Sequence, residues 1–207
     1  MARIHPDLVG SYRGRVGNAS YYVIDDENFV RSLSDKSPKE GTEEQKEART
    51  KCCILGRLSG VVKDVTKLGY PEAKNHANDF FVTNLGAVEV VDADKHVGSV
   101  AYPDLLVSFG TLVPVAVTMT SEENVLTFTY ASMEEGYGLQ ADDEVYAAFV
   151  DEKLQFSWMR KLGTRGEGGM VSENVPSFSS KENLHVYTFV VTKDRKRASR
   201  SIYHSIA

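Results

Sequence analysis

Basic and aromatic side chains gather near both ends of the chain, in a pattern that suits contact with an anionic or a polar surface. The candidate contact residues are Tyr12, Arg13, Arg15, Tyr21, Tyr22, Arg31, Lys193, Arg195, Lys196, Arg197 and Arg200. Arginines that follow a phosphate backbone beside stacking rings are typical of single-strand nucleic-acid binding. Arginine and tyrosine are also enriched where proteins contact one another. For the C-terminal group we favour a solvated hairpin tip, because such tips tolerate charge.

The histidines and cysteines are not spaced for metal binding. The five histidines are His5, His76, His96, His185 and His204. None lies three or four residues from another, as a pair of metal ligands on a helix requires. His185 and His204 belong to the last two predicted strands, where they can be neighbours. Cys52 and Cys53 are adjacent, which disfavours a disulfide between them, and a zinc site lacks a third cysteine. We expect both cysteines to be small apolar residues on a buried helix.

Two glycine-rich stretches match phosphate-binding loops by their letters alone. Residues 136–141 lie between two predicted antiparallel strands, and the acidic residues 142–144 follow where a helix should begin. Residues 163–169 lack the lysine and hydroxyl residue of a phosphate-binding loop. Ser59 lies between glycines in the middle of a predicted helix, away from the sharp turn that a nucleophilic serine needs. The sequence therefore predicts no catalytic residue, no cofactor and no metal ion, and we expect no enzyme activity.

The N-terminal basic residues belong to a predicted β-ribbon. Residues 21–24 and 28–33 have strand-like composition on either side of the acidic turn Asp25-Asp26-Glu27. Gly14, Gly17 and Asn18 tolerate the positive φ of turns. We predict two or three strands, which are barely stable alone in water, so the ribbon should pack on something or add to the sheet edge of a neighbour. Residues 34–41 are typical of a linker.

Two helices are predicted after this linker. Thr42 to Gln45 has the pattern of a capping box, and apolar residues then recur at three- and four-residue spacing up to Leu68. Cys52, Gly56 and Gly60 form a ladder of small residues, which indicates close approach of another backbone. The alternative is a kink or break near Gly60. A second helix, from Pro71 to Asn84, would pack its phenylalanines on these small residues as a helical hairpin.

The second half of the chain predicts an antiparallel β-structure. The expected strands are 88–91, 105–109, 115–120, 125–130, 144–150, 154–161, 170–175, 185–192 and 198–205, with a polar loop at 92–99. Phe156 and Trp158 alternate along one strand and should enter the core with Tyr146 or Tyr187. The predicted fold class is α+β: an N-terminal β-ribbon and helical hairpin (residues 1–112), followed by an immunoglobulin- or fibronectin-III-like β-sandwich (residues 113–207).

Composition limits the class of protein. The chain has 207 residues and a formal net charge of −5, which argues against a generally basic nucleic-acid binder but leaves local basic patches open. Residues 1–10 are polar and do not resemble a signal peptide, and no run approaches the ~20 apolar residues of a membrane helix. We therefore expect synthesis in the cytoplasm without membrane insertion, with a virion or another assembled particle as a further destination.

Several motifs along the chain resemble those of an uncharacterised domain family of Bacteroidota. They are the opening Gly10-Ser-Tyr-Arg-Gly-Arg-Val-Gly17, then Tyr22, Phe29-Val30-Arg31-Ser32, Thr42-Glu43-Glu44-Gln45 with Arg49, residues 190–196, and Ser199-Arg-Ser-Ile-Tyr203. The family has a Gly-x-x-Ser-Gly-Lys-Val-Gly opening, a Thr-x-x-Gln-x-x-x-Arg helix start and a Ser-x-Ser-x-Tyr end. Here Tyr12 and Arg13 stand in place of Phe and Ser, and Arg195 replaces a turn glycine. The family has no assigned activity, so the resemblance implies no catalytic residue.

Three functions are consistent with these patterns. The leading hypothesis is a non-enzymatic structural or interaction protein with a protein partner or self-assembly. The ribbon and helix start are similar to openings of small phage and prophage proteins, and this analogy favours a virion-associated or self-assembling component. The first alternative is nucleic-acid binding through Arg13, Arg15 and the Lys193–Arg200 hairpin. The second is an enzyme or carbohydrate-binding module at the loops near Tyr137 and Arg165.

Overall fold

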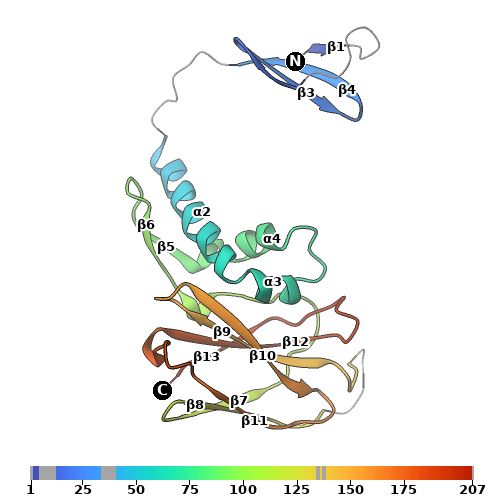
Figure 1. The fold of residues 1–207 in the computed structure, drawn as a ribbon, viewed down its shortest axis with the longest axis vertical. Coiled ribbons are helices and arrows are strands. Elements are labelled where there is room, and N and C mark those ends of the chain that lie inside the picture. Colours follow the sequence, from blue (N-terminus) through green and yellow to red (C-terminus); the bar gives the residue numbers. More distant parts are fainter. Residues whose placement is uncertain (1, 5–12, 34–40, 134–135, 137–138, 207) are drawn as a thin grey trace. The chain divides into compact units, whose positions relative to one another are not determined.

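The computed structural model describes residues 2–4, 13–33, 41–133, 136 and 139–206. The chain forms two compact units, Met1–Thr42 and Glu43–Ala207 (Figure 1). Its helices and antiparallel sheets confirm the predicted α+β class. The predicted division between residues 112 and 113 falls inside the second unit, where the helices share a buried cluster with later strands.

The first unit contains a four-stranded antiparallel sheet with the order β1-β4-β3-β2. Its strands are β1 (Ala2–Ile4), β2 (Gly14–Val16), β3 (Ala19–Ile24) and β4 (Glu27–Ser32). Asp25 and Asp26 have φ angles of 48° and 62°, in the left-handed region that aspartate tolerates in tight hairpins. The predicted hairpin around the acidic turn is therefore confirmed. The short strand β1 extends the ribbon beyond the two or three strands expected.

The first predicted helix is divided into α2 (Glu43–Val61) and α3 (Lys63–Gly69). Val62, at φ −90° and ψ 16°, separates them, so the alternative of a break near Gly60 is confirmed. The expected close approach to the small residues is wrong: Cys52, Gly56 and Gly60 are exposed, and a Cβ on either glycine would meet no atom within 4 Å among the described residues. These residues lie away from the apolar stripe that the helix buries.

The second helix, α4 (His76–Thr83), starts five residues after Pro71. Asn75 caps it, since its side chain accepts a hydrogen bond from the backbone N–H of Asn78 at 3.2 Å. Phe80 is fully buried, but it packs in the cluster beneath the helices and not on a glycine ladder. The short 3-10 helices of this unit are η1 (Leu85–Ala87), η2 (Tyr102–Asp104) and η3 (Lys181–Asn183).

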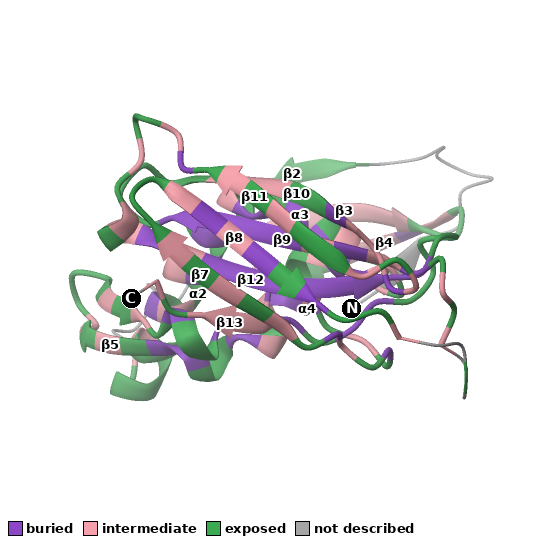
Figure 2. Ribbon diagram, turned by 90° about the horizontal axis from the view of Figure 1, so that it is seen from below, coloured by how far each residue is buried: buried purple, intermediate pink, exposed green. Residues whose placement is uncertain are grey.

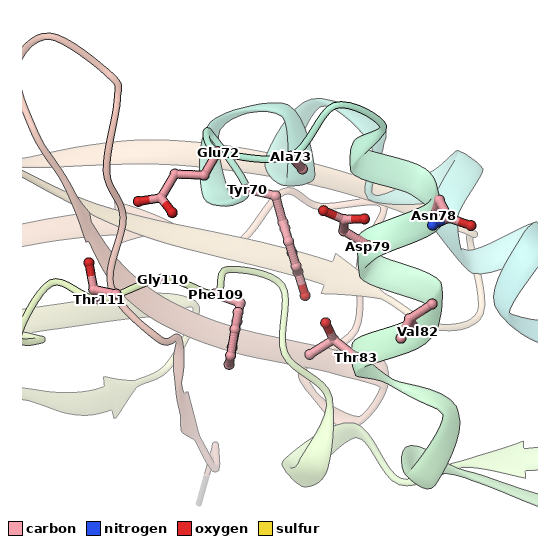
Figure 3. A pocket seen from close by; sticks show the side chains of 10 residues that line it. All are labelled: Tyr70, Glu72, Ala73, Asn78, Asp79, Val82, Thr83, Phe109, Gly110 and Thr111. Carbon is pink, nitrogen blue, oxygen red and sulfur yellow. The ribbon is translucent and has the colours of Figure 1, made fainter.

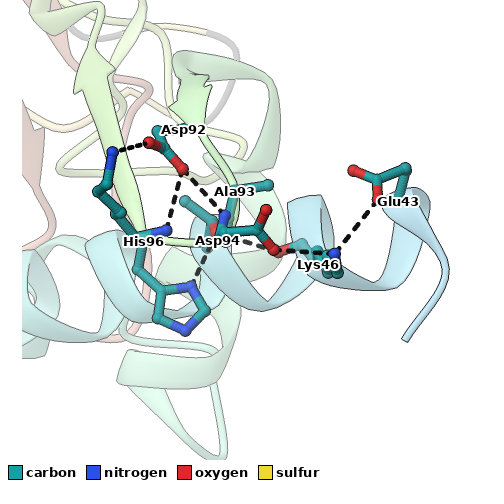
Figure 4. A network of polar contacts seen from close by, with 8 residues as sticks. Glu43, Lys46, Asp92, Ala93, Asp94 and His96 are labelled. Carbon is teal, nitrogen blue, oxygen red and sulfur yellow. Dashed lines mark hydrogen bonds and ion pairs between the residues drawn. The ribbon is translucent and has the colours of Figure 1, made fainter. Parts of the chain in front are cut away.

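A β-hairpin made of β5 (Val88–Asp92) and β6 (Val97–Val100) packs against α2. Residues 97–100 thus form a strand within the loop predicted at 92–99. Figure 4 shows how the hairpin turn meets the helix: the Thr50 hydroxyl lies 3.1 Å from the Ala93 carbonyl and 2.9 Å from His96 Nδ1. Lys46 bridges Asp94 at 2.8 Å, and this contact, with a second to Glu43, raises the pKa of the lysine.

Seven further strands form two antiparallel sheets. They are β7 (Val117–Glu122), β8 (Val125–Tyr130), β9 (Glu144–Asp151), β10 (Phe156–Thr164), β11 (Gly169–Asn174), β12 (Leu184–Val191) and β13 (Ile202–His204). One sheet has the order β10-β9-β12-β13 and the other has the order β11-β8-β7. These strands match the last seven predictions within a few residues at each end.

The strand predicted at 105–109 is wrong, although Leu105, Val107 and Ser108 are buried. Its polar backbone groups are paired with side chains and loops: the N–H of Leu106 donates to Asn84 Oδ1 at 2.7 Å, and the N–H of Val107 donates to Ser201 Oγ at 3.1 Å. The N–H of Phe109 donates to the Gly69 carbonyl at 3.0 Å. A mostly apolar segment can thus be largely buried without a strand partner.

Two buried clusters lie on opposite faces of the four-stranded sheet. Ala148, Val150, Tyr187, Phe189 and Val191 of β9 and β12 pack with the helices, whereas their alternate neighbours pack with β8. Within this unit the helices, the four-stranded sheet and the three-stranded sheet form successive layers (Figure 1). Figure 2 shows the burial of β9 and β12 in purple. Their runs of buried residues reflect cover on both faces.

The expected core position of Phe156 and Trp158 is only partly correct. Trp158 stacks on the buried ring of Phe149, with ring centroids 4.8 Å apart, and Phe156 remains 47% exposed. Tyr146 and Tyr187 face the helices, on the other side of the sheet. Phe156 and Trp158 lie on the same face of β10 as expected, but β10 is an edge strand and the ring of Phe156 remains accessible to solvent.

No helix among the described residues is both long enough and apolar enough to cross a membrane.

We predict that Asn84→Ala destabilises the second unit by roughly 2–4 kcal/mol, because buried polar groups left without a partner cost about 1–3 kcal/mol each. The buried Asn84 amide donates to the Phe80 and Leu106 carbonyls at 2.8 and 2.9 Å and accepts from the Leu106 N–H. Urea unfolding followed by the fluorescence of Trp158, the only tryptophan, measures the change. The exposed Asn174→Ala is the control and should shift stability by less than about 0.5 kcal/mol. Equal effects of the two variants would contradict the prediction.

Candidate functional surfaces

The N-terminal sheet brings part of the predicted basic group into one row. Arg15 pairs with Ser20, and Ser20 pairs with Arg31, so all three residues lie on the same face of neighbouring strands. Directly opposite residues have Cβ atoms about 5 Å apart, which places the two arginines about 10 Å from each other. Both arginines are exposed. The sequence predicted these residues as contact residues, and the strand register groups them.

An aromatic pair lies beside this row on the same face. Tyr22 and Phe29 are cross-strand partners, and their rings stack with centroids 5.7 Å apart and an interplanar angle of 16°. Phe29 was not among the predicted contact residues, although its spacing of two from Arg31 indicates the shared face. Arg13 is exposed next to the start of β2. We call Arg15, Ser20, Tyr22, Phe29 and Arg31 the arginine–aromatic face.

Two predicted contact residues do not belong to this face. Tyr21 neighbours Tyr22 along β3, so it points to the opposite side of the sheet, together with Val23 and Val30. Tyr12 lies outside the described residues. The acidic turn closes the other end of the β3–β4 hairpin, and Asp25 and Asp26 are exposed there. The hairpin therefore carries positive charge at one end and negative charge at the other.

The C-terminal basic group belongs to the second unit and forms a tight turn between β12 and β13. The Thr192 hydroxyl accepts hydrogen bonds from the backbone N–H groups of Lys196 and Arg197, at 3.2 and 3.0 Å. The hydrogen bond from Thr192 to Asp194, with further donors from Lys196, lowers the pKa of Asp194. Arg195 has a φ of 56°, in the conformation that glycine adopts most readily.

Part of the charge at this turn is already paired. Lys193 lies 3.2 Å from Asp142, and Lys196 lies 3.5 Å from Asp194. Arg195, Arg197 and Arg200 are exposed. A small hollow of about 280 Å³ is lined by Gln140, Asp142, Thr192, Lys193, Asp194 and Arg197. Because acidic groups alternate with the basic ones, this geometry favours a solvated turn over a surface for polyanions.

Arg165, predicted near a ligand-binding loop, is fully buried and faces Asp143 instead, with Nε and Oδ2 3.3 Å apart. One of its terminal nitrogens donates to the Val113 carbonyl at 2.7 Å. The ion pair is imperfect, since Arg165 Nε and Asp143 Oδ1 form no hydrogen bond within the described part of the chain. The guanidinium therefore organises the loops at this end of the sheets and does not reach the surface. Tyr137 lies outside the described residues.

His185 and His204 lie on neighbouring strands but on opposite faces. His204 is the partner of Val186, and its Nε2 lies 2.8 Å from Thr188 Oγ1. His185 stacks on Tyr102, with ring centroids 3.7 Å apart. Burial lowers the pKa of both histidines. Among the described residues no group of three or more histidine, cysteine, aspartate or glutamate side chains is placed to hold a metal ion.

Thr50 Oγ1 and His96 Nδ1 are 2.9 Å apart, the distance expected of a nucleophile and its general base, but the surroundings do not suit catalysis. Thr50 is fully buried, and its hydroxyl also lies 3.0 Å from the Lys46 carbonyl. A nucleophile must reach a substrate, and this one is enclosed by its own helix and the β5–β6 turn. The pair therefore holds the hairpin against α2.

A hollow of about 560 Å³ was not anticipated from the sequence (Figure 3). Its lining residues are Tyr70, Glu72, Ala73, Asn78, Asp79, Val82, Thr83, Phe109, Gly110 and Thr111. They come from the loop before α4, from α4 itself and from the segment after Ser108. Phe109 and Val82 are 51% and 59% exposed. The sequence signal was weak, because Phe109 lay within an apolar run that predicted a buried strand.

No family model, curated protein or solved structure matches the chain. The resemblance to the Bacteroidota family therefore stays a prediction, and the functional argument relies on the geometry described above.

We predict strong energetic coupling between Asp143 and Arg165. Asp143→Ala or Arg165→Met alone leaves one buried charge without its partner and should cost roughly 3–5 kcal/mol. The double variant should cost less than the sum, because no lone buried charge remains. Urea unfolding of all four proteins gives the coupling energy.

The surface pair Arg160 and Glu173, 3.5 Å apart, is the matched control. A double-mutant cycle on this partly exposed pair should give a coupling of about 1 kcal/mol or less. Additive costs at Asp143 and Arg165 would contradict the prediction.

The stability of the second unit should fall as the pH drops from 7.5 to 5.5. His185 and His204 have folded pKa values below the usual 6.5, so the unfolded chain binds more protons in this window. Their contribution is complete above pH 6.5 and is lost as the pH falls through the folded values. Replacing both by glutamine should flatten the slope of unfolding free energy against pH, measured by Trp158 fluorescence. An unchanged slope would show that other groups dominate.

Proposed function

We propose that this protein is a non-enzymatic structural protein that self-assembles through its N-terminal sheet. The observation that carries this proposal is the charge distribution of the β3–β4 hairpin. Arg15 and Arg31 lie together near one end, and Asp25 and Asp26 are exposed at the other. Four residues separate Arg31 from Glu27 at the turn, which corresponds to about 13 Å along the strand.

This arrangement is self-complementary. In a two-fold symmetric contact each surface meets its own copy. An axis perpendicular to the strands would place the arginine end of one sheet opposite the acidic turn of the other. Tyr22 and Phe29 would then supply apolar contact between the two charged ends. Tyrosine and arginine are among the residue types that carry most binding energy in protein interfaces; Arg15 and Arg31 are exposed, and the rings of Tyr22 and Phe29 are partly exposed.

The size of the sheet also supports a contact role. The strands of this sheet are three to six residues long, and a sheet of this kind needs an apolar face or packing on another element to be stable alone. Covering the arginine–aromatic face would therefore stabilise the sheet as well as the assembly. The second unit has its own two buried clusters, so it needs no such contact to fold.

We predict a dimer that depends on concentration and salt. Sedimentation equilibrium of the whole protein at 50 mM NaCl should show self-association, and 500 mM NaCl should weaken it by screening exposed charges. Arg15→Glu/Arg31→Glu should weaken dimerisation at least about tenfold, because like charges then meet at both ends of the contact. Asp25→Lys/Asp26→Lys should have the same effect, and an equimolar mixture of the two variants should recover association as a heterodimer.

Two controls separate this contact from general charge effects. Lys196→Glu/Arg197→Glu changes the net charge equally in the second unit and should leave dimerisation unchanged. Asp25→Asn/Asp26→Asn keeps residues that tolerate the left-handed turn and should give an intermediate loss. A strict monomer at all concentrations, or a dimer insensitive to the arginine variant, would contradict the proposal.

Nucleic-acid binding is the second candidate, and the arginine–aromatic face is the observation that favours it. Single-strand binders combine a positive surface with rings on which bases stack. The candidate predicts that a 20-nucleotide oligothymidine binds at 50 mM NaCl. Arg15→Ala and Arg31→Ala should each lower the slope of log affinity against log salt by about 1. The acidic turn on the same hairpin weighs against this candidate, and failure to bind at low salt would remove it.

The proposal also covers the kind of β-sandwich that the second unit forms and the family of the protein. We propose that β7 to β13 form a sandwich of the immunoglobulin or fibronectin III kind. Lettered A, B, C, C′, E, F and G in order, they form sheets A-B-E and C′-C-F-G. This order is related to the constant-type immunoglobulin arrangement by moving one edge strand between sheets. A virion-associated role and the Bacteroidota family remain parts of the proposal, and both rest on the motifs of the sequence.

A further inference from the structure

The hollow beside α4 has a surface chemistry that the proposed assembly does not use. Its lining combines two carboxylates, Glu72 and Asp79, with two aromatic rings, Tyr70 and Phe109. No lysine, arginine or histidine is present among the described residues that line it. Neither carboxylate forms an ion pair with another described residue. A volume of about 560 Å³ lies within the range of ligand-binding pockets.

Hydrogen bonds fix the backbone of the segment that carries Phe109. The N–H of Phe109 donates to the Gly69 carbonyl at 3.0 Å. The buried Ser108 hydroxyl lies 3.0 Å from the Gly69 carbonyl and 2.7 Å from the Ser199 carbonyl. The backbone of Phe109 is therefore fixed, while half of its side chain remains exposed. An exposed ring on a fixed backbone loses little conformational entropy when it binds a ligand.

The opposite wall supplies charge and hydroxyl groups. Figure 3 shows Asp79 and Thr83 on α4 beside the ring of Tyr70, with Phe109 on the facing segment. Burial raises the pKa of Tyr70 to about 12, and its hydroxyl donates to the Leu106 carbonyl at 2.8 Å. Tyr70 is thus a neutral wall, and the negative charge of the hollow comes from the two carboxylates.

We infer that this hollow binds the side chain of an arginine carried by a partner polypeptide. A guanidinium is planar, stacks on aromatic faces and pairs with carboxylates through several donors. Phe109 offers the face, and Asp79 and Glu72 offer the acceptors. The apolar surfaces of Ala73 and Val82 suit the methylene stem of arginine and its flanking residues. Lysine fits less well, because its compact and strongly hydrated ammonium group lacks the planar face and the fixed fork of donors of a guanidinium.

The test is an NMR titration of the whole ¹⁵N-labelled protein with the peptide acetyl-Ala-Ala-Arg-Ala-Ala-amide. Binding should shift the backbone amides of residues 72–83 and 109–111 and saturate at low millimolar concentration or below. The same peptide with citrulline, which has the shape of arginine without its charge, should bind at least about tenfold more weakly. Agmatine tests whether a free guanidine, without a polypeptide, is sufficient.

Substitutions locate the contact. Asp79→Asn should weaken peptide binding about tenfold or more, because the amide keeps an acceptor oxygen but loses the negative charge that pairs with the guanidinium. Phe109→Ala should weaken it about two- to fivefold, the range of an exposed cation–aromatic contact. Asp104→Asn removes an exposed carboxylate outside the hollow and should leave the affinity unchanged. Trp158 fluorescence and urea unfolding verify that each variant is folded.

Three results would overturn the inference: no shifts at 10 mM peptide, equal binding of the citrulline peptide, or an unchanged affinity of Asp79→Asn. Agmatine that binds as tightly as the peptide would assign the hollow to a free guanidine and overturn the polypeptide partner. The result of the peptide titration does not depend on whether the protein dimerises, because every variant keeps the arginine–aromatic face. A failed titration would therefore leave the proposed self-assembly untouched.

Discussion

Strands β9 and β12 are covered on both faces, by the helices on one side and by β8 on the other. Successive side chains along these strands enter the two buried clusters in turn. A polar side chain in this buried stretch therefore needs a hydrogen-bond partner. This constraint explains where the polar residues lie. Thr188 and Asp151, which are buried, each have a hydrogen-bond partner. Displacing the helices would expose one face of both central strands.

The elements around this central sheet serve to hold the helices on it. Asn84 and Ser201 pair the backbone of the segment at residues 105–109, which runs between α4 and the sheet without forming a strand. Thr50 and Lys46 fix the β5–β6 turn against α2. Phe109 ends this segment, and its own N–H donates to the Gly69 carbonyl, so its ring is carried into the hollow beside α4 by a hydrogen-bonded backbone. A fixed scaffold thus presents an exposed aromatic ring next to two carboxylates.

Periodicity predicted the elements better than it predicted their surroundings. Period-two patterns located β8, β9 and β12, and the capping residues located the start of α2. The sequence could not show that Cys52 and Gly56 face solvent, because small residues suit a close contact and an exposed position equally well. It also predicted a strand at 105–109, since a mostly apolar run does not reveal that the side chains of Asn84 and Ser201 will pair with its backbone. Both errors concern tertiary partners, which local pattern does not contain.

The candidate contact residues were found by type, but their grouping needed the register. The sequence placed Tyr21 and Tyr22 together, and strand alternation separates them onto opposite faces. It placed Arg165 at a ligand-binding loop, where the structure buries it against Asp143. Arg195, which stands in place of a turn glycine of the family that the chain resembles, has a positive φ. Residue types thus suggest a surface, and the pairing of strands decides which residues share it.

Hydrogen–deuterium exchange of the whole protein at low and high concentration is the most direct test of assembly through the N-terminal sheet. At 50 mM NaCl, a rise from 5 to 500 µM should slow exchange in residues 13–33. Residues 43–206 should exchange at the same rate at both concentrations. Protection confined to the second unit, or no change anywhere, would contradict the account.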